Sequence, residues 1–314
     1  MKELCVVHLV RTGNSIESLK GFLDSYHVNP GEIEHDLLIV FKGFQQREEM
    51  SIYRELLAPF RHLELDIPDE GFDITAYLNA VNRYSDQYRY FCFVNSHSVI
   101  LDPGWLRKLY EGVTQPGVGL AGATGSWLSK RTDAISWFRA LPGFVAQLFQ
   151  TGFGPNSEIV TPDAMSSSAK NTLGAKLFRF VNHFRNNMAN ILYYPPFPNH
   201  HIRTNAFIIS GDLMRSIRFP PLKKKADAYR FESGNNGLTL QASSKAPRVV
   251  VVGRDGQIYE KETWPQSNTF WNSNQENLLV ADNQTRDYQD GTPERRSYLA
   301  SMAWGRDLSV TRGE

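Results

Sequence analysis

The sequence predicts an α/β protein built on a mostly parallel, doubly wound sheet. Short runs rich in apolar and β-branched residues recur along the first half of the chain, and each has the length of a buried strand. Segments with apolar residues at helical spacing stand between these runs, and this alternation is typical of parallel sheets. The chain has 314 residues, of which 41% are hydrophobic and 21% charged, so it can bury a substantial core.

The strands and helices of the first hundred residues follow one another in simple order. Helices are expected from Ser15 or Asn14 as the cap to Tyr26, over residues 47–60, and behind Asp73 as an N-cap. The carboxyl ends of parallel strands share one edge, where ligands bind. Buried strands are expected at residues 4–10, 36–41, 62–67 and 90–94, and the loops at that edge are 11–15, 42–44, 69–73 and 95–98.

The second half of the chain is less regular. Residues 130–190 are expected to be helical, with a polar interruption around 161–168. We therefore predict one domain over 1–260 with a helical insertion at about 130–195, and a C-terminal extension over 261–314 packed on that domain. Further elements are a strand with a glycine-rich loop at 117–127, a strand at 205–210 followed by a helix from Gly211, a loop and helix at 229–241, and a strand at 248–253 before the turn Asp255-Gly256.

An apolar stripe within the insertion has two interpretations. Leu173, Leu177, Phe180, Phe184, Met188 and Ile191 fall on one helical face, and basic residues between Lys170 and Arg185 lie off it. Such a helix can lie on a membrane surface. Most amphipathic helices pack on a protein core instead, so packing against the sheet is favoured.

Charge and cysteine content restrict the class of protein and its compartment. The net charge of +1 argues against a dedicated nucleic-acid binder. Cys5 and Cys92 lie in strand-like runs and are expected to be buried free thiols, which fits a reducing compartment. The first apolar run is too short for a signal peptide, and no apolar stretch approaches the roughly 20 residues of a spanning helix. We expect a cytoplasmic location and leave peripheral contact with the inner membrane face open.

Several segments together resemble a known family. They are VVHLVRTGN at the start, DEGFDITAYLNAV, FVNSHSVILDPGWLRKL, NAFIISGDLMR, and residues 229–240. In this order they resemble nucleotide-sugar glycosyltransferases of the GT-A fold, in particular family 2-like and rhamnan-synthesis-type bacterial polysaccharide transferases. The resemblance covers about 1–125 and 200–260. It implies a GT-A-like, Rossmann-like sheet and transfer of a sugar, with inversion, from a nucleotide-sugar donor to a glycan or lipid-linked acceptor in bacterial surface polysaccharide synthesis.

Two other functions share this kind of sheet. A non-catalytic carbohydrate- or nucleotide-binding protein on the same scaffold is the main alternative, because a metal-binding aspartate of the family is missing. A sugar-phosphate nucleotidyltransferase needs a glycine-rich, basic loop after the first strand, and Arg11-Thr12-Gly13-Asn14 is too sparse for that.

Glycosyl transfer to a hydroxyl needs a general base, since a hydroxyl is a weak nucleophile at neutral pH. The first candidate is Glu232 in FESGNNGL, where the resemblance places an Asp or Glu before a helix. Asp227 is the second candidate. Either carboxylate could instead cap a helix or pair with the lysines at 223–225.

The metal site of the resembled family is incomplete here. Asn95 and His97 stand where its DxD aspartates are expected. Because Mg²⁺ and Mn²⁺ prefer oxygen ligands, either His97 is an unusual ligand of such an ion or the reaction runs without metal. In the second case the diphosphate could be neutralised by Arg203, His200, His201 or Lys223–Lys225. His97 could also be a polar loop residue that contacts a sugar.

The remaining candidates surround the expected nucleotide and acceptor. Donor-binding residues are expected at the strand ends and the loops after them: Arg11, Thr12, Gly13, Lys42, Asp69, Asp73, Asn95 and His97. Acceptor-binding residues are expected around the glycine-rich loop and an aromatic, proline-rich segment: Trp127, His200, His201 and Arg203.

Overall fold

The computed structural model describes residues 1–150 and 173–305. The chain divides into two compact units, which are described separately. The sheet unit comprises Met1–Leu128 and Pro198–Glu314, and the helical unit comprises Ser129–Phe197. The helical unit corresponds to the insertion expected at about 130–195.

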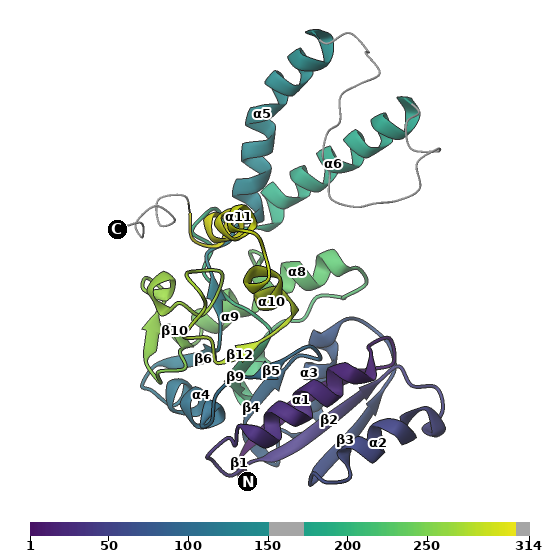
Figure 1. Ribbon diagram of the computed structural model, residues 1–314, viewed down its shortest axis with the longest axis vertical. Helices are drawn as coiled ribbons and strands as arrows, with labels where there is room; N and C mark the ends of the chain where they lie inside the picture. The colour runs from purple at the N-terminus through teal and green to yellow at the C-terminus, as the bar shows by residue number, and fades with distance from the viewer. Residues whose placement is uncertain (151–172, 306–314) are drawn as a thin grey trace. The chain divides into compact units, whose positions relative to one another are not determined.

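The sheet unit is built on eight strands in the order β11-β10-β6-β9-β4-β1-β2-β3 (Figure 1). The pairs β1·β2, β2·β3, β1·β4 and β6·β10 are parallel, which confirms the predicted α/β class. The reversed strand β9, antiparallel to both β4 and β6, was not anticipated. The strands are β1 (Lys2–Arg11), β2 (Asp36–Lys42), β3 (His62–Ile67), β4 (Tyr88–Val94), β6 (Val118–Gly122), β9 (Ala206–Ser210), β10 (Arg248–Val252) and β11 (Ile258–Glu260).

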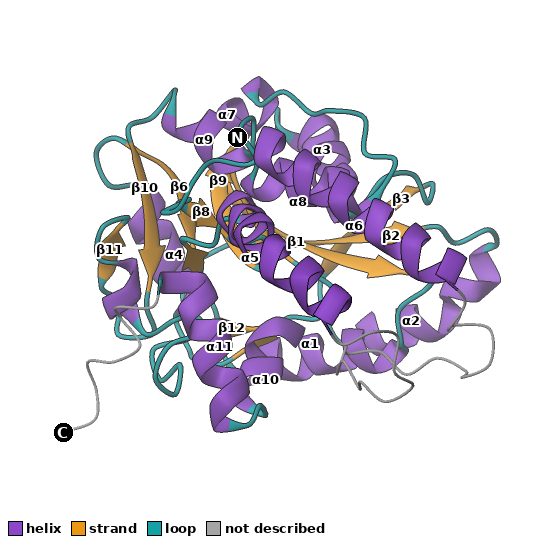
Figure 2. Cartoon of the chain, turned by 90° about the horizontal axis from the view of Figure 1, so that it is seen from above, coloured by secondary structure: helices purple, strands orange, loops and turns teal. Residues whose placement is uncertain are grey.

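Helices cover both faces of this sheet, and each face has its own apolar core. One core is closed by α1 (Ile16–Val28), α2 (Ser51–Leu57) and α4 (Trp105–Val113), and the other by α3 (Asp73–Tyr84), α7 (Gly211–Ser216) and α9 (Leu238–Ser243). Figure 2 shows α1 and α3 on opposite sides of the strands. Since α1 and α2 connect β1, β2 and β3 on one face and α3 leads to β4 on the other, the topology switches between β1 and β4.

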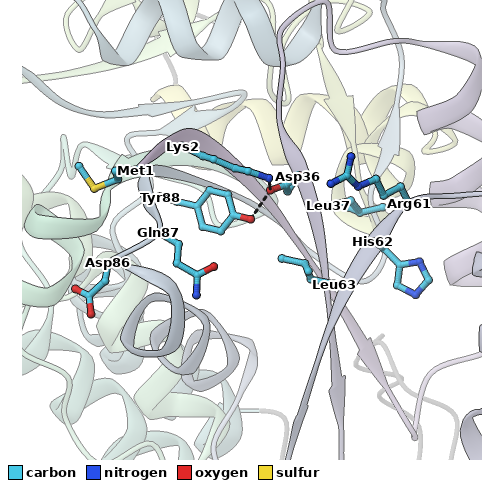
Figure 3. A pocket seen from close by; sticks show the side chains of 10 residues that line it. All are labelled: Met1, Lys2, Asp36, Leu37, Arg61, His62, Leu63, Asp86, Gln87 and Tyr88. Carbon is cyan, nitrogen blue, oxygen red and sulfur yellow. Dashed lines mark hydrogen bonds and ion pairs between the residues drawn. The ribbon is translucent and has the colours of Figure 1, made fainter.

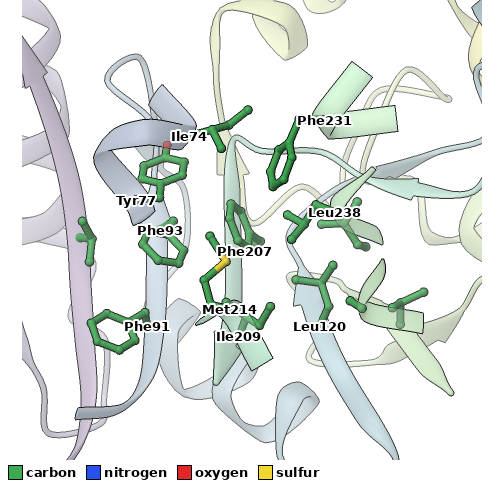
Figure 4. Packing of buried hydrophobic residues seen from close by; sticks show 14 of the residues in the cluster. Ile74, Tyr77, Phe91, Phe93, Leu120, Phe207, Ile209, Met214, Phe231 and Leu238 are labelled. Atoms are coloured by element: carbon green, nitrogen blue, oxygen red, sulfur yellow. The ribbon is translucent and has the colours of Figure 1, made fainter. Parts of the chain in front are cut away.

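Successive side chains of β1 point to opposite faces of the sheet, and both faces are buried, which explains why the whole strand is apolar. Val7 and Leu9 point into one core, and Val6 and Val10 into the other. In the first of these cores, Tyr77 of α3 packs beside Phe93 and Phe207 (Figure 4). The helix after β1 begins as predicted, because the Ser15 Oγ accepts a hydrogen bond from the Glu17 N–H at 3.1 Å.

The largest errors of sequence interpretation lie in the C-terminal third. This region contains four helices, α8 (Lys225–Ser233), α9, α10 (Asn283–Gln289) and α11 (Pro293–Trp304), and the 3₁₀ turn η2 (Trp264–Ser267). Two short antiparallel pairs also involve residues after 200: β5 (Val99–Ile100) with β12 (Val280–Ala281), and β7 (Gly125–Ser126) with β8 (His201–Ile202). Only Leu299, Ala303 and Trp304 of α11 are buried, so its sequence shows no helical stripe.

The helix expected over 47–60 is a 3₁₀ turn, η1 (Arg47–Met50), followed by the shorter α2.

The helical unit contains α5 (Lys130–Gln150) and α6 (Leu173–Tyr193). Aromatic contacts join the two helices: Trp137 lies 4.8 Å from His183 and Phe138 lies 5.2 Å from Phe184, between ring centroids. The expected interruption at 161–168 and Lys170 lie outside the described residues. Among the helices that the structure describes, none has the length and hydropathy to cross a membrane.

Candidate functional site

The loops after the central strands meet at the carboxyl edge of the sheet. The Thr12 N–H donates to the Lys42 carbonyl at 3.1 Å, and the Gly43 N–H donates to the Ile67 carbonyl at 3.0 Å. These backbone bonds tie the ends of β1, β2 and β3 to one another. Gly13 faces open space, since nothing lies within 4 Å of where its Cβ would be. The strand-end loops chosen from the sequence are therefore neighbours.

Arg11 and Asp69 form a two-pronged ion pair at this edge. The guanidinium donates from Nε to Oδ1 at 2.9 Å and from Nη2 to Oδ2 at 3.0 Å. This hydrogen bonding lowers the pKa of Asp69. Both side chains remain 37% exposed, so the pair can still meet a ligand.

Lys42 is fully buried and holds the neighbouring loop in place. Its Nζ donates to the carbonyls of Gly71 at 2.9 Å and Phe72 at 3.0 Å and lies 3.9 Å from Asp69 Oδ1. Burial lowers the pKa of Lys42, against the opposing charges of Asp69 and Asp73. Lys42 therefore positions the loop before α3, a role that its place at a strand end did not reveal.

Asp73 is the first residue of α3, and the N-cap is Phe72, so the expected capping role of Asp73 is wrong. Burial raises the pKa of Asp73, while Lys42, Arg11 and His97 act in the opposite direction. We call Arg11, Lys42, Asp69 and Asp73 the β1–β2 cluster.

Asn95 and His97 shape the loop after β4. The Asn95 Oδ1 accepts hydrogen bonds from the His97 N–H and the Ser98 hydroxyl, both at 2.9 Å, which is an Asx turn. The His97 carbonyl accepts from Arg286 at 3.1 Å, and its half-buried imidazole lies near Asp73. Within the described ranges, no group of three His, Cys, Asp or Glu side chains could hold a metal ion. With the Asn95 oxygen occupied, this donor set does not fit Mg²⁺ or Mn²⁺, and we derive no step through a metal.

Glu232 lies in the last turn of α8, at the same edge of the sheet. It is 9% exposed. Its Oε1 accepts from the Thr204 N–H at 3.3 Å and lies 3.8 Å from Arg203 Nε. Because β9 is antiparallel, the segment before it reaches the carboxyl end of β4, where the Asn95 N–H donates to the Asn205 carbonyl at 2.9 Å.

A buried imidazole, His201, and a guanidinium, Arg203, accompany Glu232. Burial lowers the pKa of His201 to about 4, although the nearby charge of Glu232 opposes this, and its Nδ1 lies 2.8 Å from the Asn199 carbonyl. Arg203 lies over the Phe270 ring at 5.0 Å and donates to Gln284. We call His201, Arg203 and Glu232 the α8 cluster.

The aromatic candidates pack into a wall. The Trp127 ring lies 5.3 Å from His200 and 5.9 Å from Trp304, and its Nε1 donates to the Lys261 carbonyl at 3.0 Å. His200 also faces Trp264 at 6.0 Å, and burial lowers its pKa. Sequence reasoning placed Trp127 and His200 together but missed the two C-terminal tryptophans.

Asp227, the second candidate base, occupies a capping position. Its Oδ2 accepts from the N–H groups of Lys223 at 3.1 Å and Lys224 at 2.9 Å, and Arg230 lies 3.4 Å from Oδ1. The sequence allowed a helix-capping role for either Asp227 or Glu232, and the structure shows that role for Asp227. The two carboxylates of α8 therefore have different surroundings.

Tyr77 lies in α3, one turn after Asp73. Its buried hydroxyl has no hydrogen-bond partner among the residues that the structure describes. Burial raises its pKa, and the negative charges of Asp73 and Glu232 raise it further. The sequence assigned Tyr77 to the core by its spacing. Its position one turn after Asp73 was the available signal of a site residue.

A pocket of about 420 Å³ lies at the opposite, amino edge of the strands (Figure 3). Two of its lining residues pair with a third: the Lys2 Nζ donates to Asp36 at 2.5 Å, and the Tyr88 hydroxyl donates to the same carboxylate. None of the candidate residues named from the sequence lines it. The β1–β2 and α8 clusters, at the other edge, remain the candidate site.

Comparisons with known proteins concern the fold. No protein-family model matches the chain, and no curated protein matches it. It is similar to many solved structures, among them the following three. The first is 4-diphosphocytidyl-2C-methyl-D-erythritol synthase from Anaerococcus prevotii, with 6% sequence identity over 73% of this chain and 83% of that chain and a TM-score of 0.38. The second is TarS from S. aureus, with 12% identity over 99% of this chain and 73% of that chain and a TM-score of 0.43. The third is core-mannan synthase A from Aspergillus fumigatus in its Mn/GDP form, with 11% identity over 73% of this chain and 63% of that chain and a TM-score of 0.35. We base the function on the residues of this chain alone.

Proposed function

We propose that the protein is a glycosyltransferase that moves a sugar from a nucleotide-sugar donor to a hydroxyl of a glycan or lipid-linked acceptor. The observation that carries this proposal is the Glu232 carboxylate, largely buried at the carboxyl edge of the sheet with its Oε1 3.8 Å from Arg203 Nε. The resemblance of the sequence motifs to bacterial polysaccharide transferases supports the same class.

Glu232 acts as the general base. It removes the proton from the acceptor hydroxyl as that oxygen forms a bond to the anomeric carbon, while the bond from that carbon to the donor phosphate breaks. The nucleoside diphosphate leaves with the bonding electrons, so a single displacement inverts the anomeric centre. Arg203, whose Nε lies 3.8 Å from Glu232 Oε1, places a positive charge beside the carboxylate and orients it before the acceptor binds.

The β1–β2 cluster holds the donor. Carboxylates such as Asp69 suit ribose hydroxyls or a base N–H, and Arg11 can meet a phosphate without losing its partner. The lysine run lies beside this cluster, because Leu222 is 3.6 Å from the Cβ position of Gly71. Lys223–Lys225 can then share the negative charge that gathers on the leaving diphosphate.

A thermal-shift screen against UDP-, dTDP-, GDP- and CMP-sugars tests the proposal, because a ligand that binds only the folded state raises the melting temperature. At least one donor should raise it, and Asp69→Asn should weaken that shift. The donor found should then be consumed in the presence of a sugar acceptor.

The possible outcomes separate the functions. A shift without turnover for any acceptor supports the alternative, a carbohydrate- or nucleotide-binding protein on this scaffold. No shift with any donor contradicts both. Activity that is lost with EDTA and restored by Mn²⁺ contradicts the proposed metal-free reaction.

A further inference from the structure

One face of α6 carries a row of exposed apolar side chains. Val181, Phe184, Met188 and Leu192 are 45%, 40%, 42% and 68% exposed. Their spacing of three, four and four residues places them on one line along the helix, about 16 Å long at 1.5 Å per residue. We call these four residues the α6 row. Exposed apolar rows of this kind mark interaction sites.

The contacts that hold the helical hairpin together lie along the adjoining side of α6. Phe180 and His183 contact Trp137 of α5, at 6.1 and 4.8 Å between ring centroids, and Tyr194 just after α6 is buried. Phe184 touches Phe138 of α5 and still keeps two fifths of its surface exposed. Most of the exposed apolar surface of the α6 row is therefore not needed for the contact between α5 and α6.

The charge of the helical unit indicates what covers this row. Residues 129–197 carry seven Lys or Arg and three Asp or Glu, a net +4, whereas the rest of the chain carries 27 and 30, a net −3. The α6 helix itself has Lys176, Arg179 and Arg185 and no acidic residue. An exposed apolar row on a unit with a net positive charge is complementary to an anionic lipid surface. A second copy of this unit would oppose +4 with +4.

We propose that the helical unit docks on anionic membranes, with the α6 row inserted at the level of the lipid headgroups and the basic side chains paired with lipid phosphates. This goes beyond the proposed transferase function and does not depend on it. It takes up the other interpretation that the sequence left open, a helix on a membrane surface, since α6 packs on α5 and still exposes apolar side chains.

Co-sedimentation of the full chain with vesicles tests the proposal. One vesicle preparation is pure phosphatidylcholine and the other also contains phosphatidylglycerol. The matched variants are Met188→Glu on the α6 row and Asn186→Glu, an exposed position two residues away on another face, so that both introduce the same charge. Leu192→Ser tests the row without adding charge, and circular dichroism checks helix content.

The wild-type chain should bind the phosphatidylglycerol vesicles, and added salt should weaken that binding. Met188→Glu should lower it at least about tenfold, and Asn186→Glu by no more than about threefold. Absence of binding to anionic vesicles overturns the proposal, as do equal effects of the two glutamates. A dimer in sedimentation that Leu192→Ser dissociates, without vesicle binding, would show that a second copy covers the row.

Discussion

The two clusters at the carboxyl edge of the sheet differ in how they hold charge. The β1–β2 cluster pairs opposite charges directly, and its outer pair, Arg11 and Asp69, is well exposed to water. The α8 cluster is buried, and Arg203 and Glu232 lie at 3.8 Å, longer than a hydrogen bond. Charges act more strongly where water is excluded. The difference suits one cluster to holding a polar ligand and the other to proton transfer.

The largest change in stability is expected from the β1–β2 cluster. Lys42→Met should lower the free energy of unfolding by about 3 kcal/mol, because it leaves two backbone carbonyls and Asp69 without their buried cation. Urea denaturation measures the loss. Lys20→Met is the matched control: Lys20 is exposed and forms an ion pair with Asp24, so its replacement should leave the stability nearly unchanged. Equal losses would show that Lys42 does not support its loop.

Acid should destabilise the protein through two buried histidines, His201 of the α8 cluster and His8 of β1. Burial lowers the pKa of His8 to about 3 and that of His201 to about 4, so the unfolded chain binds these protons first. Their contribution to stability is complete above the unfolded pKa near 6.5 and is lost as the pH falls below it. His8 stacks on Phe22 at 3.7 Å, so phenylalanine can take its place.

His8→Phe should therefore lose less stability than the wild-type protein between about pH 7.5 and pH 5, by roughly 2 kcal/mol. Asp73, whose raised pKa acts in the opposite direction, is present in both proteins and cancels in the difference. Denaturant melts at the two pH values measure the effect. The same pH dependence in both proteins would mean that His8 takes up its proton in the folded state.

The smallest effect is expected at the start of α8. Asp227→Ala removes a carboxylate that accepts two backbone N–H groups, and the loss of such a cap costs about 1 kcal/mol. The melting temperature should fall slightly, and turnover should remain near that of the wild-type protein. A large loss of turnover with an unchanged melting temperature would instead assign Asp227 to the chemistry.

The sequence predicted the β1–β2 cluster well because each of its loops directly follows a buried strand. Parallel strands bring such loops to one edge, whatever lies between them in the chain. It could not show that Lys42 is buried and serves the loop at 69–73, since this depends on where the Gly71 and Phe72 carbonyls point.

The α8 cluster was only partly predictable. Glu232 and Arg203 were named from the sequence, but their proximity depends on β9 running antiparallel between β4 and β6. Phe270 and Gln284, which hold Arg203, come from a C-terminal region without clear periodicity. Strand direction and these long-range contacts are set by tertiary packing, which a local pattern does not record.

The most direct test of the account is the turnover of Glu232→Gln with the donor found by thermal shift, beside the wild-type protein and Asp227→Ala. If Glu232 takes the acceptor proton, glutamine should lower kcat by roughly 10² to 10⁴ while donor affinity and melting temperature change little. A Glu232→Gln enzyme that turns over within about threefold of the wild-type rate would contradict the assignment, because an amide cannot accept that proton.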